Sequence, residues 1–381
     1  MIIRQVYTNH YNRPSNQAVK SMNKITDALL LVRNMVLPEP VYDFWCAELG
    51  LMSRRHAVVA RAVKVVSETP DAVSIWLKPN ANFAGVLPGQ HINIGVEING
   101  HLVQRSYSVS GVHGRYFRIT TRKVANGKVS SYLNQFAHRG MVLTLGDVYG
   151  DVTVHSFDQK PALFLAGGIG ITPIISMLES WSLSLRQQPV QLVYWGKRSQ
   201  DLAFVDRLKS LAQKHSWFEL KILETQFLER NSDGTPKLLA ETSAWFEDMK
   251  GRLSHFEAFA CGNDGFVDQI RERFAPLVNN FYFESFSPLL ATAEPGLPIQ
   301  VRLTKQNRTV TIPSGVNLLN ALERAGVAVA SGCRRGTCNT CSCNKISGIT
   351  QHQGDHSIHE ATAAGFKPCT HSALSDISLE M

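Results

Sequence analysis

The spacing of hydrophobic and polar positions divides the chain into stretches with different periods. From residue 54 to 157, short alternating runs are separated by turn pairs such as Pro88-Gly89 and Asn99-Gly100, which predicts an antiparallel β-barrel. An Asn-Gly pair between two such runs is typical of a type I′ hairpin. Strands are expected at residues 57–67, 73–77, 91–98, 116–122 and 141–145.

After Pro161 the pattern changes to short, fully apolar runs that alternate with helical periodicity. Such runs are typical of strands buried on both faces of a parallel sheet, so residues 158–290 are predicted to form an α/β domain. The expected strands are 162–166, 190–195 and 256–260, and the expected helices are 174–182 and 201–211.

The C-terminal stretch, residues 299–381, is predicted to be an α+β domain with β-grasp order. A strand at 299–304 and its hairpin partner at 308–312 precede a helix at 317–325, which Gly326 ends. A cysteine-rich loop and two strands follow. A proline-containing linker at 291–298 and a helical extension at 1–53 complete a multidomain architecture.

Composition and charge narrow the possible classes of function. Of the 381 residues, 44% are hydrophobic and 18% are charged, as in ordinary globular proteins. The sequence lacks an apolar run long enough for a membrane span or a secretory signal, so a cytoplasmic location with reduced cysteines is expected. The net charge of +8 is scattered, without basic runs that contain aromatic residues, which argues against nucleic-acid binding.

Four of the seven cysteines have a spacing that predicts a metal centre. Cys333, Cys338 and Cys341 are spaced C-x4-C-x2-C, and Cys369 follows on a later segment, which is the plant-type [2Fe–2S] pattern. Two sulfide-bridged irons need four further soft donors. Zinc is the alternative, but zinc ribbons present two close cysteine pairs. Cys343, the remaining thiol nearby, is expected to pack rather than to bind metal.

With these cysteines inside a β-grasp pattern, residues from about 297 to 381 resemble a plant-type ferredoxin domain. The resemblance implies a [2Fe–2S] cluster held by the four cysteines named above. A domain of this kind needs a reductant, and the preceding 240 or so residues are where the sequence should provide one.

Arg105-Ser106-Tyr107-Ser108 resembles the flavin motif of the ferredoxin–NADP reductase superfamily. The resemblance implies that the arginine contacts the flavin phosphate, that the tyrosine lies against the isoalloxazine ring, and that Ser108 donates a hydrogen bond near N5. A guanidinium binds phosphate through two parallel hydrogen bonds, and an aromatic ring stacks on a flat heterocycle. Alternatively, Arg105 is a surface residue of a strand and Tyr107 packs against its neighbours, without a flavin.

A second segment, which begins Gly127-Lys128-Val129-Ser130, resembles the glycine turn that enters a short helix in the same superfamily. Backbone N–H groups at that helix start would bind the pyrophosphate. Residues 146–150 match the family's later glycine turn more loosely. The resemblance implies FAD as the flavin, with FMN less favoured.

A glycine-rich turn lies between the expected strand 162–166 and the following helix. Glycines there let a pyrophosphate approach the backbone, and a proline suits a helix start. The strand–turn–helix context and the superfamily's G-G-x-G-x-x-P element imply a nicotinamide dinucleotide site. Its candidate residues are Gly167, Gly168, Gly170, Thr172 and Pro173.

Further candidates follow the later strands of this domain. Lys197 and Arg198 favour the 2′-phosphate of NADPH, although two solvated loop cations, and hence NADH, are the alternative. The resemblance places Cys261 and Gly262 beside the nicotinamide, whereas a buried, inert cysteine is the alternative. It also places Glu284 and Phe286 near the flavin, unless they belong to the linker.

The three motif groups together resemble ferredoxin–NADP reductase-like flavoproteins fused to a C-terminal ferredoxin domain. Proteins of this kind pass electrons to oxygenases, fatty-acyl desaturases or related metalloenzymes. The resemblance implies that electrons pass from NADPH through FAD and the [2Fe–2S] cluster to a partner metalloenzyme. The flavin is needed because NADPH gives up two electrons while the cluster carries one. The implied catalytic residues are Tyr107, Ser108, Cys261 and Glu284.

Three alternatives stay open: an FMN- and NADH-dependent reductase of a Rieske-type oxygenase, an iron–sulfur redox sensor without turnover, and a reductase of a nitrogen-oxide or hybrid-cluster partner. The stretch from residue 297 onward contains eight Lys or Arg and five Asp or Glu. Because this stretch has a net positive charge, a neutral or acidic partner surface is expected. Residues 1–53 are expected either to form a helical extension that packs on the barrel or to dock at a membrane or a partner enzyme, including a membrane-bound one.

Overall fold

The computed structural model describes residues 39–49, 51–52, 57–125, 127–184, 186–227, 249, 251–286 and 295–381. The chain divides into two compact units, Met1–Ala57 and Val58–Met381. In the first unit, α2 spans Glu39–Glu48 and exposes Phe44 and Trp45. Most of the helical extension predicted for residues 1–53 lies outside the described residues. None of the described helices has the length and apolarity required to cross a membrane.

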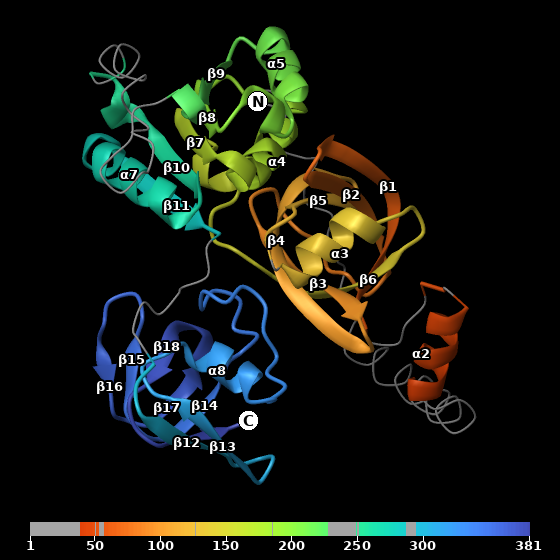
Figure 1. Cartoon of the computed structure of the whole chain (residues 1–381). Coiled ribbons are helices and arrows are strands. Elements are labelled where there is room, and N and C mark those ends of the chain that lie inside the picture. The colour runs from red at the N-terminus through yellow and green to blue at the C-terminus, as the bar shows by residue number, and fades with distance from the viewer. Residues whose placement is uncertain are drawn as a thin grey trace, which may run out of the picture. The chain divides into compact units, whose positions relative to one another are not determined.

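The second unit begins with a closed six-stranded antiparallel barrel in the order β1-β2-β5-β4-β3-β6 (Figure 1). Asn99 and Gly100 both have positive φ, 53° and 74°, which confirms the type I′ turn predicted between β3 and β4. α3 packs against β4 and β5. The bounds are β1 Val59–Thr69, β2 Ala72–Pro79, β3 His91–Ile98, β4 His101–His113, β5 Tyr116–Arg122, α3 Lys128–Phe136 and β6 Val142–Tyr149.

The predicted barrel is confirmed, but its longest strand, β4, is missing from the strands expected from sequence. The middle of β4 is the polar run Gln104–Ser108, whose side chains are only partly buried except for Ser108. A strand of this kind lacks the apolar alternation on which the prediction relies. In the folded protein, β4 is held in the barrel by its pairing with β3 on one side and with β5 on the other.

The parallel sheet predicted for the next domain is also present, with strand order β11-β10-β7-β8-β9. Figure 1 shows α4 and α5 on one face of this sheet and α7 on the other. The chain leaves β7 toward β8 and β9, and then returns to the other side of β7 for β10 and β11. Ligands of such sheets bind where the strand order reverses, beyond the carboxyl ends of the strands.

The elements of this domain are β7 Ala162–Gly167, α4 Ile171–Ser182, β8 Val190–Gly196, α5 Val205–Lys214, β9 Phe218–Glu224, β10 Glu257–Gly262, α7 Asp264–Phe274 and β11 Asn280–Ser285. The helix expected at 201–211 begins only at Val205, because Phe204 has a left-handed backbone with φ of 64°. The ring of Phe204 is buried under Arg118, at 4.7 Å. This tertiary contact fixes the helix start, which sequence periodicity alone misplaces.

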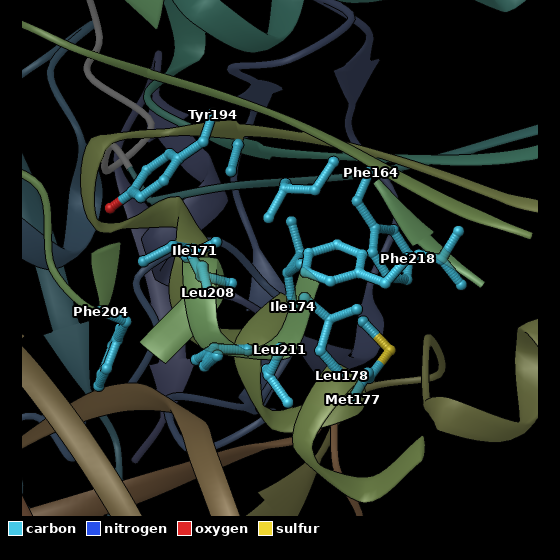
Figure 2. Packing of buried hydrophobic residues seen from close by; sticks show 14 of the residues in the cluster. Phe164, Ile171, Ile174, Met177, Leu178, Tyr194, Phe204, Leu208, Leu211 and Phe218 are labelled. Atoms are coloured by element: carbon cyan, nitrogen blue, oxygen red, sulfur yellow. The ribbon is translucent and has the colours of Figure 1, made fainter. Parts of the chain in front are cut away.

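The main core of this domain lies between the sheet and helices α4 and α5 (Figure 2). Phe164 of β7 stacks on Trp181 of α4 with ring centroids 5.7 Å apart, and Phe157 contacts both rings edge-on. Fully burying aromatic side chains of this size contributes on the order of 2–3 kcal/mol each. The core therefore fixes the end of β7 and the start of α4, between which the glycine-rich turn lies.

The C-terminal domain confirms the predicted β-grasp order. Its main sheet has the order β13-β12-β19-β14-β17, with β12 and β19 parallel, and α8 packs on its buried face. A small sheet, β16-β15-β18, lies beside it. The bounds are β12 Pro298–Leu303, β13 Arg308–Pro313, α8 Leu318–Arg324, β14 Cys343–Ser347, β15 Thr350–His352, β16 Ile358–His359, β17 Ala363–Phe366, β18 His371–Ala373 and β19 Ile377–Glu380.

Short 3-10 turns complete the described part: η1 Val154–Phe157, η2 Gly168–Gly170, η3 Ser199–Asp201, η4 Thr225–Phe227, η5 Leu253–His255, η6 Ala275–Leu277 and η7 Pro368–Thr370. Two of them bear on function, because η2 forms the glycine-rich turn and η7 carries Cys369. The domain boundaries expected from sequence remain predictions. Residues 287–294, which include the first half of the expected linker, lie outside the described residues.

Candidate functional site

The four cysteines with plant-type spacing come together in two pairs. Residues 331–342, here called the cluster loop, join α8 to β14 and carry three of them. Cys333 lies in hydrogen-bonding contact with Cys338, and Cys341 with Cys369 of η7. Two thiols for each of two irons is the arrangement that a [2Fe–2S] cluster requires. Among the described residues, no three His, Cys, Asp or Glu side chains are grouped to hold a single metal ion.

Donors in the cluster loop point at the sulfur atoms. The backbone N–H groups of Arg335 and Cys338 donate to Cys333 Sγ, each at 3.3 Å, and the Thr340 hydroxyl donates to Cys338 Sγ at 3.1 Å. The contact with Cys338 and these amides lower the pKa of Cys333 to about 4. Contact with Cys369 likewise lowers the pKa of Cys341 to about 7. The same contacts raise the pKa of the partner thiols, Cys338 and Cys369. Each pair thus favours one thiolate, the form that binds iron, which donates no proton and accepts the hydrogen bond of its partner.

The remaining nearby thiol, Cys343, lies at the start of β14 and outside both pairs. It is half-buried, and burial raises its pKa to about 12. Its side chain packs against the hydrophobic core of the C-terminal domain, as a small apolar group does. The packing role for Cys343 stays a prediction.

The predicted flavin motif lies on β4, opposite β3. Ser108 Oγ is buried and has no hydrogen-bond partner among the described residues. Burial raises the pKa of Tyr107 to about 12, which keeps its hydroxyl neutral, and it lowers the pKa of Arg105, with the Arg334 charge acting in the same direction. A buried hydroxyl without a partner is costly unless a ligand satisfies it. These features fit a bound flavin.

The second predicted flavin segment forms the start of α3. A Cβ on Gly127 would lie 2.3 Å from Ser130 Oγ, so only glycine leaves room for this hydroxyl. Ser130 Oγ accepts a hydrogen bond from Val124 N at 3.3 Å and so braces the turn. Within the fully described helix 128–136, no side chain caps the N-terminus and the first turn has no acidic residue. Lys128 and Val129 lie in that turn, whose N–H groups suit a phosphate.

The glycine-rich turn after β7 packs directly against the end of β10. A Cβ on Gly170 would lie 2.0 Å from the carbonyl oxygen of Cys261, and one on Gly167 would lie 2.8 Å from the Phe266 ring. Gly168 has a φ of +54°, in the left-handed region. Thr172 and Pro173 are buried in the first turn of α4. The five predicted residues thus form one tight turn at the sheet's switch point, as in dinucleotide sites.

Cys261 and Glu284 are neighbours across the parallel pair β10–β11, and Gly262 pairs with Ser285. The Cys261 side chain is fully buried, and burial together with the Glu284 charge raises its pKa. It is therefore a neutral thiol rather than a nucleophile. Phe286 follows β11, donates its N–H to the Gly262 carbonyl at 2.9 Å and packs on the main core.

His91, which no sequence motif indicates, completes this group. Its Nε2 lies 3.1 Å from the Glu284 carboxylate, and its ring stacks on Tyr149. In β3 it pairs with Ser108 of the flavin motif. Burial by itself would lower the pKa of His91, but the Glu284 charge offsets this effect and the pKa lies above its usual value. A single histidine at a strand start carries no signal that would reveal such a partner.

The two cations expected to select the nucleotide are differently placed. Both follow the end of β8 and are exposed. Arg198 forms an ion pair with Asp201, with Nε 2.9 Å from Oδ2, and this contact raises the arginine pKa. Lys197 has no salt bridge within 4 Å among the described residues. The structure thus leaves the Lys197 charge, more than the Arg198 charge, available to a ligand.

Comparisons with known proteins agree with this architecture. Family models match in order: an oxidoreductase FAD-binding domain at residues 58–151, an oxidoreductase NAD-binding domain at 164–272 and a 2Fe-2S iron-sulfur cluster binding domain at 301–371. The chain therefore belongs to the ferredoxin–NADP reductase-like flavoprotein reductases with a C-terminal plant-type ferredoxin domain. It is an NAD(P)H-dependent oxidoreductase with FAD, a [2Fe–2S] cluster and NAD(P)H as cofactors.

Three similar proteins extend the comparison. The NADPH oxidoreductase of Mycobacterium tuberculosis is 26% identical over 84% of this chain and 83% of its own. The glycine betaine monooxygenase reductase subunit of Chromohalobacter salexigens is 24% identical over 86% and 95%. The solved phthalate dioxygenase reductase, 22% identical, matches 85% of this chain and 97% of its own with a TM-score of 0.59, and it shares the fold.

The glycine turn gives a direct test of the nucleotide site. In a Gly170→Ala variant the new methyl group would meet backbone atoms, which cannot move as a side chain can. Because misplacements near 1 Å cost up to about 100-fold in rate, we expect kcat/KM for NAD(P)H to fall by about tenfold or more, measured with ferricyanide as acceptor. Gly265→Ala, whose Cβ would meet nothing closer than 3.9 Å, is the matched control. Equal losses in both variants would contradict the assignment.

The His91–Glu284 pair predicts a pH-dependent stability. Because the folded pKa of His91 is raised, the pair stabilises the protein fully below the unfolded value of about 6.5, and this contribution is lost as pH rises through the folded pKa. We expect the difference in Tm between the wild type and His91→Gln to be largest near pH 6 and to shrink toward pH 9. The exposed His113→Gln variant should show no such trend. A difference that grows with pH would refute the pairing.

Proposed function

We propose that this reductase passes electrons from NADPH, through a flavin held by Arg105–Ser108 and the start of α3, to a cluster on Cys333, Cys338, Cys341 and Cys369. The observation that carries the proposal is the contact between the cluster loop and the barrel, where Asn93 Nδ2 donates to Thr340 Oγ1 at 2.9 Å. Asn93 pairs with Ser106 of the flavin motif. The contact therefore brings the cluster loop to the flavin motif itself.

Each group of residues has a separate part in this proposal. The N–H groups at the start of α3, with Ser130, hold the pyrophosphate, and Arg105 pairs with phosphate. Tyr107 lies against the flavin ring, and Ser108 Oγ, buried without a partner, donates to it. When bound, the flavin accepts two electrons from NADPH and releases them singly to the cluster.

The nicotinamide side of the proposal rests on the turn at 167–173 and on β10. The glycine turn holds the pyrophosphate, while the neutral Cys261 thiol and Gly262 present an uncharged surface to the nicotinamide. Glu284, held by His91, and Phe286 border the same space. We propose Lys197 as the residue for the 2′-phosphate, because Arg198 is paired with Asp201. This pairing makes Arg198 a weaker candidate than the sequence indicates.

The acceptor that we propose is an oxygenase. The proposal is supported by the relative from Chromohalobacter salexigens, which is a monooxygenase reductase subunit, and by the fold shared with phthalate dioxygenase reductase. A desaturase or another metalloenzyme, reached at a membrane surface from the cytoplasm, would use the same electron path. The net positive charge after residue 297 favours a neutral or acidic docking surface on the partner.

An anaerobic titration tests the chain of carriers. We expect NADPH to bleach the flavin absorbance near its visible maximum and then the broad iron–sulfur bands, in a ratio that reports two electrons per nucleotide. The parallel titration with NADH should need a higher concentration if Lys197 recognises the 2′-phosphate. Bleaching of neither chromophore would refute turnover and would favour an iron–sulfur sensor instead.

A cysteine pair tests the electron path. Cys338→Ser removes one of the paired thiols, so we expect loss of the iron–sulfur bands and a fall of at least about tenfold in NADPH-dependent cytochrome c reduction. Ferricyanide reduction, which the flavin alone can support, should stay near the wild-type rate. Cys343→Ser is the matched control, since this thiol lies outside both pairs. Undiminished cytochrome c reduction by Cys338→Ser would show that electrons bypass the cluster.

A further inference from the structure

Asn93 lies at the meeting point of the flavin barrel and the cluster loop. It is fully buried on β3, a strand paired on both sides, with β4 and with β6. A buried carboxamide has to find hydrogen-bond partners for both its oxygen and its nitrogen. Here one partner belongs to the barrel and the other to the cluster loop, which are separated by more than 200 residues along the chain.

The carboxamide connects the flavin motif to a cluster cysteine through three successive hydrogen bonds. The Ser106 hydroxyl donates to Asn93 Oδ1 at 2.5 Å, and Asn93 Nδ2 donates to Thr340 Oγ1 at 2.9 Å. The Thr340 hydroxyl in turn donates to Cys338 Sγ at 3.1 Å. Because Asn93 donates to the threonine oxygen, the threonine hydrogen is left free to point at the sulfur.

Two glycines pack closely against the side chain of Asn93. A Cβ on Gly332 of the cluster loop would lie 2.7 Å from Asn93 Oδ1, and a Cβ on Gly146 of β6 would lie 2.9 Å from Asn93 Cβ. The loop backbone can approach the barrel this closely only because Gly332 has no side chain. This close packing and the hydrogen bonds of Asn93 together fix the position of the cluster loop.

A second contact of the cluster loop is weaker. Arg335 Nη1 lies 3.2 Å from Asp264 Oδ1 of α7, and both side chains are partly exposed, at 22% and 43%. Solvent screens partly exposed ion pairs of this kind, so they contribute little, whereas a buried polar group that loses its partner incurs the full cost of desolvation. The Asn93 contact is thus the stronger constraint on where the loop lies.

We infer that Asn93 is a positioning residue for electron transfer: it docks the cluster loop on the flavin barrel and orients the Thr340 hydroxyl toward Cys338. This inference rests on the proposed function, since it assumes that Cys338 binds the cluster and that Ser106 lies in the flavin motif. It assigns Asn93 no contact with nucleotide or substrate. Its loss should therefore affect the step between flavin and cluster and leave the reduction of the flavin intact.

The test compares Asn93→Leu, which keeps nearly the same volume but cannot form hydrogen bonds, with wild-type holoprotein. In anaerobic stopped-flow experiments with NADPH, we expect flavin reduction to stay within about twofold and the following cluster reduction to slow by about tenfold or more. Asn344→Leu is the matched control, because Asn344 is an exposed carboxamide of the same domain that binds Glu380.

Two readouts do not depend on turnover. Hydrogen exchange of the peptide 331–342 in the oxidised protein should speed up in Asn93→Leu and not in Asn344→Leu. Thr340→Val removes both the acceptor of the Asn93 hydrogen bond and the donor to Cys338 Sγ. Since donors to sulfur stabilise the reduced cluster, its midpoint potential should fall, and exchange of the loop should speed up as it does in Asn93→Leu. Asn93→Asp should lower the potential too, because a carboxylate would compete with the sulfur for the threonine hydrogen.

Unchanged loop exchange together with an unchanged flavin-to-cluster rate in Asn93→Leu would overturn the inference. If Asn93→Leu does not fold, an unchanged potential in Thr340→Val would overturn the part that concerns the cluster. A wild-type protein that NADPH does not reduce would instead overturn the proposed function, and loop exchange would still decide whether Asn93 docks the loop.

Discussion

A buried guanidinium joins the flavin barrel to the nucleotide-binding domain, and the geometry of the whole site depends on it. Arg118 of β5 reaches Glu179 of α4 at 3.2 Å and is held between the rings of Trp76 and Phe204, 5.1 and 4.7 Å away. Burial lowers its pKa, and the Glu179 charge opposes this effect. Removing one partner of a buried pair costs about 3–5 kcal/mol, so the two domains are held in a fixed relation.

The fixed relation between the two domains explains why the glycine turn before α4 lies so close to the end of β10. With α4 fixed against the barrel, the turn before it must pass within contact distance of the end of β10, and only glycine at position 170 allows this. The same end of the sheet carries Cys261 and Glu284, and His91 of the barrel reaches Glu284. Residues from both domains thus meet at one end of the sheet, where the proposed nicotinamide and flavin sites adjoin.

Sequence patterns predict much of this arrangement, and the failures have physical causes. The cysteine spacing, the Asn99-Gly100 turn and the apolar strand before the glycine turn are local signals, and each is found as predicted. The sequence pattern does not indicate strand β4, because the middle of this strand is polar and only partly buried. Such a stretch lacks the apolar periodicity that reveals secondary structure, as is expected where a strand contributes to a proposed site.

His91 and Asn93 were missed for a different reason, because their importance comes from partners far along the chain. Glu284 follows His91 by nearly 200 residues, and Thr340 follows Asn93 by more than that. Nothing in the short stretch that contains both residues distinguishes them from ordinary strand residues. Arg198 shows the converse, since its position after β8 predicts nucleotide binding but its neighbour Asp201 already pairs with it.

The cluster loop has two sides with different tasks. Gly332 and Cys338 are buried, and Gly332 faces Asn93 of the barrel, whereas Thr337, Asn339 and Ser342 are exposed. A cluster that takes electrons from a flavin in its own chain and gives them to another protein needs one fixed side and one open side. The closely fitted, hydrogen-bonded contact at Asn93 provides the fixed side. The open side consists of small polar residues, which a partner surface can cover without burying a charge.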